Sequence, residues 1–340
     1  MLYLPELDSH PVLCWSVIGP AALVDAITPL VDEWRRRAAV ARVHRLAPGE
    51  RLAETLGQLL ATRPLATGNG RCDRPLLLVL EDPTLPSLRA QVAGTALSHS
   101  LAPLSGWLRM DACALAAYAA RAVAILQRAG EVPASLVLLG PREERYRAAL
   151  DDVQACAAGA SGLCPLRWSA ERIRKSPLLS ALQLGAAAAL YLGHGNRHGW
   201  LAYGGLGLDD FVARAKPWSP DESTAVFFAL GCGGASPSGI ADALVGQGVA
   251  GAVLAPMGDP LHVDNRQLAL ALVDAMARGH RSLADLLEAV STATAAMRGG
   301  GYMVIGDPGL AARAAPGALA RGLGVFAPAP DAVLVPIDVH

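Results

Sequence analysis

The chain has 340 residues, of which 52% are hydrophobic and 17% charged, and its formal net charge is −1. This composition is that of a globular protein with ample core material, and the balanced charge gives no general attraction to nucleic acid or to an anionic membrane. The N-terminus lacks a basic segment followed by a long apolar core, and no apolar run reaches about 18 residues. We therefore expect neither a signal peptide nor a membrane span.

Six cysteines are scattered along the sequence without a C-x-x-C pair. Without an export signal, such scattered cysteines are typical of a protein from a reducing compartment. We therefore predict a cytoplasmic location and reduced cysteines whose roles are independent of one another.

The N-terminal part alternates apolar runs with segments of helical periodicity. The predicted strands are 12–18, 41–46 and 75–83, and the predicted helices are 21–38, 50–61 and 111–128. The segment 84–110, which contains two prolines, is predicted to be irregular. We expect a smaller α/β accessory domain over residues 1–130, and the stretch 130–134 has the composition of a linker.

The alternation becomes more regular after residue 131. The predicted strands are 135–141, 164–168, 186–195, 224–234, 250–256 and 302–310. The predicted helices are 142–158, 170–183 with Ser169 as N-cap, 239–249, 264–279 and 282–297. Strands that alternate with helices favour a mostly parallel sheet covered on both faces. We predict an α/β domain with a six-stranded sheet over 131–315, followed by an Ala/Pro/Gly-rich tail over 316–340.

Two of these predicted strands end at a reactive side chain that glycine follows, His194-Gly195 and Cys232-Gly233. Ligand sites in open α/β sheets lie beyond the C-terminal ends of the strands, so neighbouring strands would bring the two side chains together. A nearby imidazole promotes formation of the nucleophilic thiolate. Gly195 and Gly233 would let a substrate backbone approach, and an N–H group in the turn after each strand suits a developing oxyanion.

The motifs YLGHG and FALGCGG resemble those of the caspase–gingipain–separase superfamily of cysteine peptidases, most closely its bacterial CHAT and gingipain-like members. GVAGAVLAPMGDP, LALALVDAMARGHRSLADLLEAV and YMVIGDPGL are similar to the strand, the paired helices and the closing strand that follow the nucleophile in that family. The resemblance covers residues 135–312. It implies a caspase-like three-layer fold and hydrolysis of a peptide bond through a thioester acyl-enzyme.

The resemblance also implies roles for individual residues. Cys232 would be the nucleophile, His194 the proton-transfer partner, and the N–H groups of Gly195 and Cys232 the oxyanion hole. In many members an acidic residue reads the side chain before the scissile bond, and Asp259 and Asp264 lie in the corresponding loop. This loop reads MGDP where many CHAT sequences carry a Trp and a double acidic step, so the resemblance leaves a basic preference open.

The partners implied by the resemblance are a protein or peptide substrate and an activating protein, and no cofactor is implied. Bacterial relatives of this kind often serve in stress or phage-defence systems and answer to a partner protein. Exposure makes the linker 130–134 and the loop 209–224 candidate processing sites.

Two other functions remain open for the same residues. A caspase-like scaffold would bind a partner without cleaving it. The stretch GCGGAS, after a strand and before a helix, is close to a dinucleotide fingerprint, but Ser236 replaces the third glycine and no acidic residue ends a strand about twenty residues on.

Several candidate residues also have a structural interpretation. His198 follows His194 at the spacing of a helical metal pair, but the glycines around it argue against a helix, so we predict no metal and leave a substrate contact for His198. Asp259 is also typical of a turn and Asp264 of a helix N-cap. Asp307 is predicted to form the turn that follows the last strand.

Overall fold

The computed structural model describes residues 13–37, 40–47, 50–61, 66–67, 70–71, 74–92, 105–128, 135–160, 162–212, 218–291 and 301–311. The N-terminal part contributes the strands β1 (Leu13–Pro20), β2 (Val40–Leu46), β5 (Arg74–Glu81) and β6 (Ser105–Arg109), besides the short pair β3 (Ala66–Thr67) and β4 (Gly70–Arg71). Its helices are α1 (Ala21–Ala26), α2 (Thr28–Arg36), α3 (Leu52–Ala61), α4 (Leu88–Val92) and α6 (Ala112–Arg128).

The C-terminal part contributes six longer strands. They are β7 (Ser135–Leu139), β8 (Cys164–Arg167), β9 (Ala188–Leu192), β13 (Thr224–Leu230), β14 (Ala250–Pro256) and β15 (Tyr302–Gly306). The helices are α7 (Glu144–Ala158), α8 (Lys175–Ala181), α9 (Leu208–Val212), α10 (Ile240–Gly246), α11 (His262–Ala277) and α12 (Leu283–Ser291). Short elements are β10 (Gly195–Asn196), β11 (Gly199–Trp200) and β12 (Leu206–Gly207), with 3₁₀ turns at Leu182–Leu184, Ala202–Gly204 and Pro220–Glu222.

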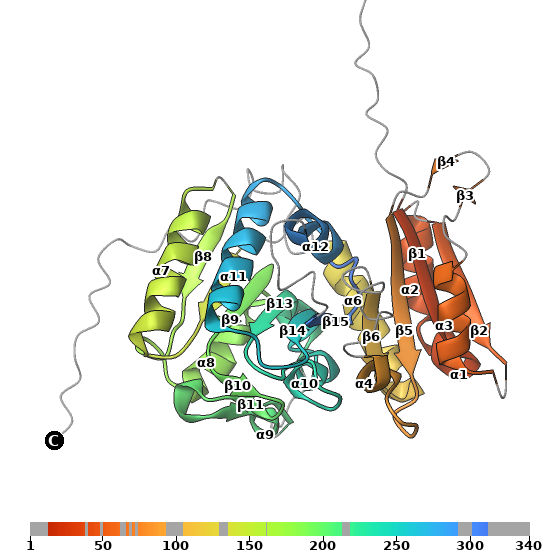
Figure 1. The fold of residues 1–340 in the computed structure, drawn as a ribbon, viewed down its shortest axis with the longest axis horizontal. Coiled ribbons are helices and arrows are strands. Elements are labelled where there is room, and N and C mark those ends of the chain that lie inside the picture. The colour runs from red at the N-terminus through yellow and green to blue at the C-terminus, as the bar shows by residue number, and fades with distance from the viewer. Residues whose placement is uncertain are drawn as a thin grey trace, which may run out of the picture.

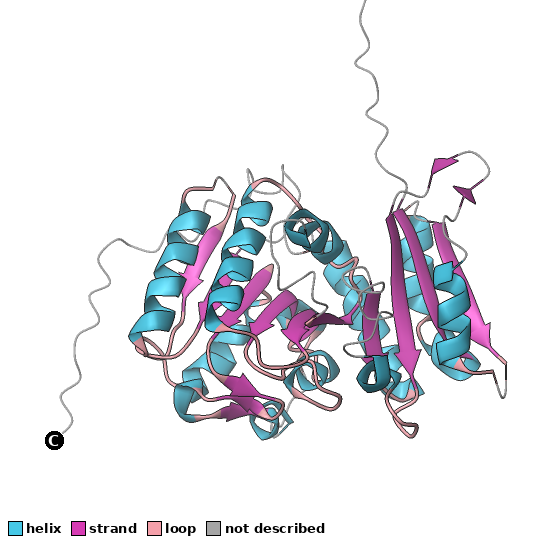
Figure 2. Ribbon diagram, in the orientation of Figure 1, coloured by secondary structure: helices cyan, strands magenta, loops and turns pink. Residues whose placement is uncertain are grey.

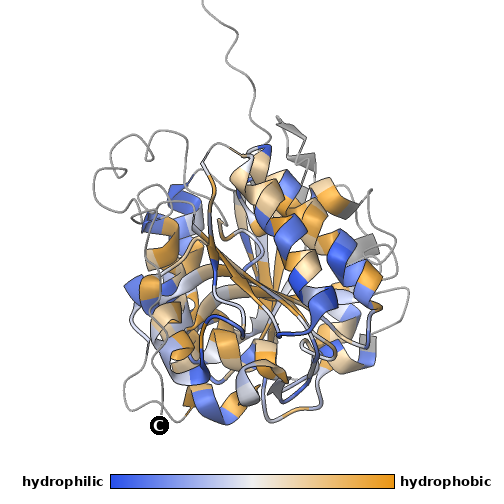
Figure 3. Ribbon diagram, turned by 90° about the vertical axis from the view of Figure 1, so that its left-hand side faces the viewer, coloured by the Kyte–Doolittle hydropathy of each residue, from blue (hydrophilic) through white to orange (hydrophobic). Residues whose placement is uncertain are grey.

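Ten strands form one sheet in the order β2-β1-β5-β6-β15-β14-β13-β9-β7-β8, with helices on both faces (Figures 1 and 2). All neighbours are parallel except β14 and β15, where two parallel halves meet. The strands β9, β13 and β14 are buried along their whole length, as continuous apolar runs in a sheet covered on both faces should be. Figure 3 shows apolar strands of the sheet between helices that are partly hydrophilic and partly hydrophobic. The predicted α/β class and the six predicted strands after residue 131 are confirmed, but the prediction that these six form a sheet of their own is wrong, because β15 pairs with β6 and all ten strands share one sheet.

The strand β15 joins the two halves of the sheet through glycine and a buried aspartate. A Cβ on Gly106 would lie 1.9 Å from the carbonyl oxygen of Gly306, so only glycine permits this approach of β6 to β15. The next residue, Asp307, is fully buried and accepts hydrogen bonds from the indole N–H groups of Trp15 at 3.1 Å and Trp34 at 2.7 Å. It also accepts the N–H of Gly309 at 2.9 Å, so the predicted turn is confirmed.

Two predictions for the N-terminal part are wrong. The segment 84–110 contains α4 and the internal strand β6, whose apolar pattern is interrupted by the glycine that β15 requires. The predicted helix 21–38 is two helices, α1 and α2, which meet at Ile27 because Pro29 has no N–H to continue the helix from α1 and is accommodated in the first turn of α2.

Two further predictions are corrected in the C-terminal part. Ser169 is no N-cap, because its hydroxyl accepts a hydrogen bond from Arg167 Nε at 2.7 Å and α8 begins only at Lys175. The loop 209–224 contains α9 and a 3₁₀ turn at its two ends, and residues 213–217 lie outside the described residues. The linker 130–134 and the tail 316–340 also lie outside them.

The cysteines differ from one another in redox state. Cys14 is disulfide-bonded, whereas Cys113, Cys156, Cys164 and Cys232 are free thiols. The prediction of reduced cysteines is therefore wrong for Cys14, and because disulfides persist in oxidising compartments, the cysteines no longer support a cytoplasmic location. Across the described ranges, every helix is too short or too polar to cross a membrane.

Candidate active site

His194 and Cys232 follow two neighbouring strands of the sheet. The parallel strands β9 and β13 pair with Leu192 opposite Leu230, and each reactive side chain follows its strand by two residues. The two strands therefore end at the same edge of the sheet, where ligand sites of α/β folds lie. The prediction that these two strands are neighbours is confirmed.

Glycines let the two turns after these strands pack against each other. A Cβ on Gly195 would lie 3.5 Å from the Cα of Gly231, and a Cβ on Gly233 would lie 3.3 Å from the backbone nitrogen of Arg197. Gly233 has a φ of 63°, in the left-handed region that favours glycine. The turn that carries the histidine and the turn that carries the cysteine are thus in direct contact.

The thiol of Cys232 is partly buried, and its pKa is raised above that of an ordinary cysteine. Burial is the largest cause, followed by the negative charge of Asp259 and a hydrogen bond to this carboxylate. A thiol with a raised pKa is protonated at neutral pH, so it would need a base to remove its proton before it could act as a nucleophile. Asp259, predicted to lie in the substrate loop, is therefore at the thiol.

The imidazole of His194 is held from the loop between β7 and α7. Oε2 of Glu143 lies 3.4 Å from Nε2, and the guanidinium of Arg145 also contacts Nε2 while it pairs with Glu143 at 3.3 Å. On the other side of the ring, the Tyr146 hydroxyl lies 3.4 Å from Nδ1. The side chain of His194 remains 40% exposed, so a substrate can reach it.

The two nitrogens of His194 thus face different surroundings. Burial raises the pKa of Tyr146, and the charges of nearby Glu143 and Cys232 raise it further. Nε2 lies on the side of Glu143 and Arg145, and Nδ1 lies on the side of the Tyr146 hydroxyl.

Glu143, Arg145 and Tyr146 were missed by the sequence analysis. The signal that was available is their position directly after the predicted strand 135–141, at the same sheet edge as the two reactive residues. A charged run after a buried strand is also typical of a solvated helix start, so the sequence alone does not single these residues out.

The backbone donors at the site differ in availability. The N–H of Leu201 donates to the His194 carbonyl at 3.1 Å, so Gly195 and Trp200 form a non-hydrogen-bonded pair of the antiparallel strands β10 and β11. The N–H of Gly195 therefore points away from β11. The N–H of Gly233 instead donates to the Gly258 carbonyl at 2.8 Å. The prediction of an oxyanion donor at Gly233 is therefore corrected, because its N–H is already engaged.

The start of α11 fixes the end of the strand that precedes the cysteine. The Asn265 side chain donates to the Leu230 carbonyl at 3.1 Å and accepts the hydroxyl of Tyr302 at 2.6 Å. Both side chains are buried. Asp264 lies inside the first turn of α11, which begins at His262, so the prediction that it is the N-cap is wrong. Its charge contributes, after burial, to the raised pKa of Tyr302.

A second histidine flanks Tyr146. The rings of His262 and Tyr146 meet edge to face with centroids 4.7 Å apart, and the same tyrosine meets His194 edge to face at 5.1 Å. Burial lowers the pKa of His262, and the positive charges of Arg145 and Arg266 lower it further. The three rings form one aromatic group beside the reactive cysteine.

The remaining predicted contact residue, His198, lies on the exposed turn between β10 and β11. Its ring accepts a hydrogen bond from Nε of Arg197 at 2.9 Å. Among the residues that the structure describes, no three His, Cys, Asp or Glu side chains form a group that could hold a metal ion.

No protein-family model and no curated protein sequence matches the chain. Solved structures do match. The Arg-specific cysteine proteinase gingipain R superposes with a TM-score of 0.68 at 13% identity, over 91% of this chain and 80% of that one. The complex of the pro- and mature domains of RgpB from Porphyromonas gingivalis gives 0.68 at 14% identity, over 87% and 79%. A structure described as a protease gives 0.66 at 13% identity, over 89% and 79%.

These similarities extend over both halves of the ten-stranded sheet, so the shared fold is not confined to the six strands after residue 131. The chain has the fold of the gingipains. The expected caspase-like α/β fold is thereby confirmed.

Proposed function

We propose that the protein is a caspase-like cysteine endopeptidase in which Cys232 and His194 form a catalytic dyad. The observation that carries the proposal is that the two residues end neighbouring parallel strands and lie in turns that touch. The fold shared with cysteine proteinases supports the same reaction class. The motifs YLGHG and FALGCGG support a relation to the gingipain-like and CHAT members.

The first half of the reaction forms the acyl-enzyme. Because burial and Asp259 raise the pKa of the Cys232 thiol, the sulfur starts protonated and loses its proton to the imidazole of His194 as it attacks. The sulfur bonds to the carbonyl carbon of the scissile peptide, and the negative oxygen accepts the backbone N–H groups of Gly195 and Cys232. The tetrahedral intermediate then collapses: the C–N bond breaks, and the imidazolium gives its proton to the leaving amine.

The second half releases the product. A water molecule loses a proton to the same imidazole and attacks the thioester carbonyl. The C–S bond breaks, the sulfur takes the proton back, and a carboxylic acid leaves. Glu143, 3.4 Å from Nε2, would orient the ring in both halves and stabilise the imidazolium once Nε2 carries a proton.

Regulation by a partner or by processing belongs to the same proposal. One similar solved structure is a complex of pro- and mature domains of RgpB, and by analogy a further segment or protein would control this chain. For this chain, the loop 209–224, which follows β12 and contains most of α9, is the proposed processing segment. Controlled proteolysis there should change the rate of peptide hydrolysis by the full chain.

The proposed activity is tested with a fluorogenic peptide library that varies the residue before the scissile bond. Wild type should hydrolyse a subset, and Cys232→Ala and His194→Ala should lose about a thousandfold or more. Cys113→Ala removes an exposed free thiol and is the matched control, which should keep full activity. Binding of a peptide without hydrolysis would favour the scaffold function instead, and activity that persists in Cys232→Ala would exclude this mechanism.

A further inference from the structure

A pocket of about 650 Å³ opens beside the proposed dyad. Its walls are the loops after three strands, with residues 141–143, 173–176 and 201–204 among the lining. Two lining residues contact His194 directly: Oε2 of Glu143 lies 3.4 Å from Nε2, and the N–H of Leu201 donates to its carbonyl at 3.1 Å. A substrate whose scissile bond lies at the dyad would therefore pass this pocket.

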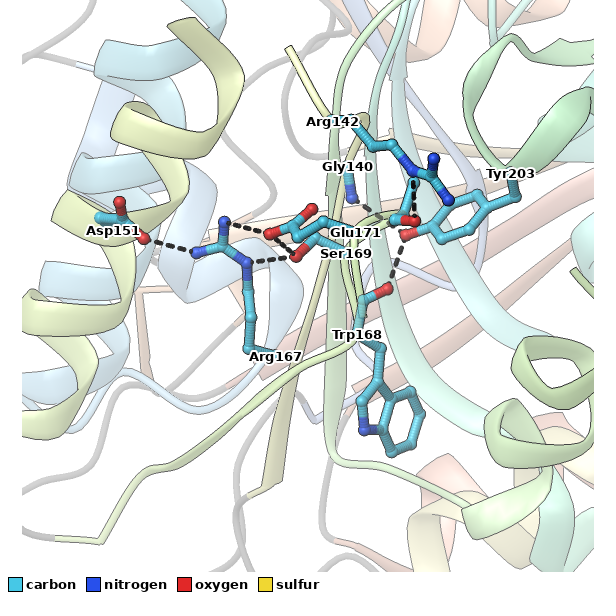
Figure 4. Close-up of polar contacts among 9 residues, drawn as sticks. Gly140, Arg142, Asp151, Arg167, Trp168, Ser169, Glu171 and Tyr203 are labelled. Carbon is cyan, nitrogen blue, oxygen red and sulfur yellow. Dashed lines mark hydrogen bonds and ion pairs between the residues drawn. The ribbon is translucent and has the colours of Figure 1, made fainter. Parts of the chain in front are cut away.

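The pocket is preformed, because hydrogen bonds tie its walls together. The hydroxyl of Tyr203 donates to the Trp168 carbonyl at 2.7 Å and accepts the N–H of Gly140 at 3.1 Å (Figure 4). Nε of Arg142 donates to the Ala170 carbonyl at 2.9 Å. Tyr203 has a φ of 62°, a strained conformation that persists only where surrounding contacts impose it.

Positive charge dominates the lining. Arg142 uses only its Nε in the wall contact, so both of its terminal nitrogens are left for a ligand. Arg174 is exposed in the wall, and no carboxylate of the described residues pairs with either arginine. The lining charges that are already compensated are those of Lys175, paired with Asp210 at 3.0 Å, and Glu143, paired with Arg145 at 3.3 Å.

We propose that this pocket binds an acidic side chain of the substrate close to the scissile peptide bond. A guanidinium matches a carboxylate with two parallel N–H donors, so Arg142 and Arg174 would hold the carboxylate. Ile173 and the 63% exposed Leu201 would cover its methylene groups. The proposal rests on the proposed function, and it concerns a different subsite from Asp259, which lies at the thiol.

The test separates binding from turnover by using the full-length Cys232→Ala protein. Labelled peptides carry one glutamate, moved in turn through the positions on both sides of the expected scissile bond, and each has a glutamine counterpart. Fluorescence polarisation at low salt should show one position where glutamate binds at least about tenfold more tightly than glutamine, because a charge-assisted bidentate contact is lost. Added salt should reduce this ratio.

Variants then assign the preference to the pocket. Adding Arg174→Gln or Arg142→Gln to Cys232→Ala should bring the ratio of glutamate-peptide to glutamine-peptide affinity close to one. Arg142→Lys should keep part of the preference for glutamate. Arg172→Gln is the matched control, since Arg172 is exposed in the same loop but does not line the pocket. Equal binding of glutamate and glutamine peptides at every position, or a preference that survives both glutamine variants, would overturn the proposal.

The same proteins distinguish this inference from the proposed function. Cys232-dependent cleavage by wild type without any preference for acidic peptides would support the peptidase function and refute the acidic subsite. Arginine-dependent binding of acidic peptides by Cys232→Ala, together with a wild type that cleaves none of them, would support the acidic subsite and refute the peptidase function.

Discussion

The carboxylate of Glu143 and Nε2 of His194 lie 3.4 Å apart, although the two residues come from different strand ends of the sheet. The contact lies on the Nε2 side of the ring, whereas the Tyr146 hydroxyl lies 3.4 Å from Nδ1. The contact with Glu143 gives the proposed dyad a third member, whose role is to orient the imidazole and to stabilise its charged form.

Replacing Glu143 by glutamine should slow peptide hydrolysis. The amide keeps the shape of the side chain but loses the charge that stabilises the imidazolium, so we expect kcat to fall about 10- to 100-fold with little change in KM. Steady-state kinetics measures this, and Glu144→Gln, a change at the exposed neighbouring residue, is the control. An unchanged kcat in Glu143→Gln would show that the contact has no catalytic role.

Replacing Asp259 by asparagine should make the thiol of Cys232 more reactive in the absence of substrate. The negative charge of Asp259 and its hydrogen bond both raise the pKa of the thiol, so their loss lowers that pKa and increases the thiolate fraction at neutral pH. We expect several-fold faster alkylation of Cys232 by iodoacetamide, followed by mass spectrometry.

The exposed thiol of Cys113 provides an internal reference in the same samples, since its alkylation rate should not respond to Asp259. A rate at Cys232 that is unchanged or slower in Asp259→Asn would contradict the assigned contact between the carboxylate and the thiol.

Replacing Asn265 by leucine should destabilise the fold near the cysteine. The buried Tyr302 hydroxyl and the Leu230 carbonyl would both lose their partner, which costs about 1–3 kcal/mol for each buried polar group left unsatisfied. Urea unfolding measures the loss. Tyr302→Phe removes one of these unsatisfied groups, so the double variant Asn265→Leu/Tyr302→Phe should recover part of the lost stability. Purely additive effects of the two changes would argue against the hydrogen bond between Asn265 and Tyr302.

Asp307 should make stability depend on pH. Burial raises the pKa of its carboxyl, against the opposing hydrogen bonds from Gly309, Trp34 and Trp15. The folded protein therefore holds this proton more tightly than the unfolded chain does. Its contribution to the free energy of unfolding is fully present below the unfolded pKa, near pH 4, and is lost as pH rises through the folded pKa.

Asp307→Asn has no such proton, so the difference in unfolding free energy between wild type and variant should shrink as pH rises from about 4, as urea unfolding at a series of pH values would show. Asp32→Asn changes an exposed aspartate and should leave that pH dependence as in wild type. A difference between wild type and Asp307→Asn that is constant with pH would refute the raised pKa.

The strands of the site could be predicted because strands buried on both faces are continuous apolar runs in the sequence. The runs that form β9, β13 and β14 are apolar except for Thr224, and each ends at proline or is followed by glycine, which is typical of strands covered on both faces. Placing His194 and Cys232 at one edge then required only that β9 and β13 be neighbours.

Other features depend on contacts between distant segments and leave no local pattern. The strand β6 is short and contains Gly106, so its place beside β15 follows from a backbone approach that only the fold reveals. The contact of Glu143 with His194 requires β7 to lie next to β9. The use of the Gly233 N–H by Gly258 depends on how the turn after β14 folds.

Trapping of the acyl-enzyme tests the dyad most directly. A cleavable peptide is mixed with the full-length protein, quenched in acid within milliseconds to seconds, and the protein is digested and its mass spectrum recorded. The proposed mechanism predicts an acyl group in thioester linkage on Cys232, absent from Cys232→Ala and formed far more slowly in His194→Ala. Peptide cleavage without this adduct, or an acyl group on another residue, would contradict it.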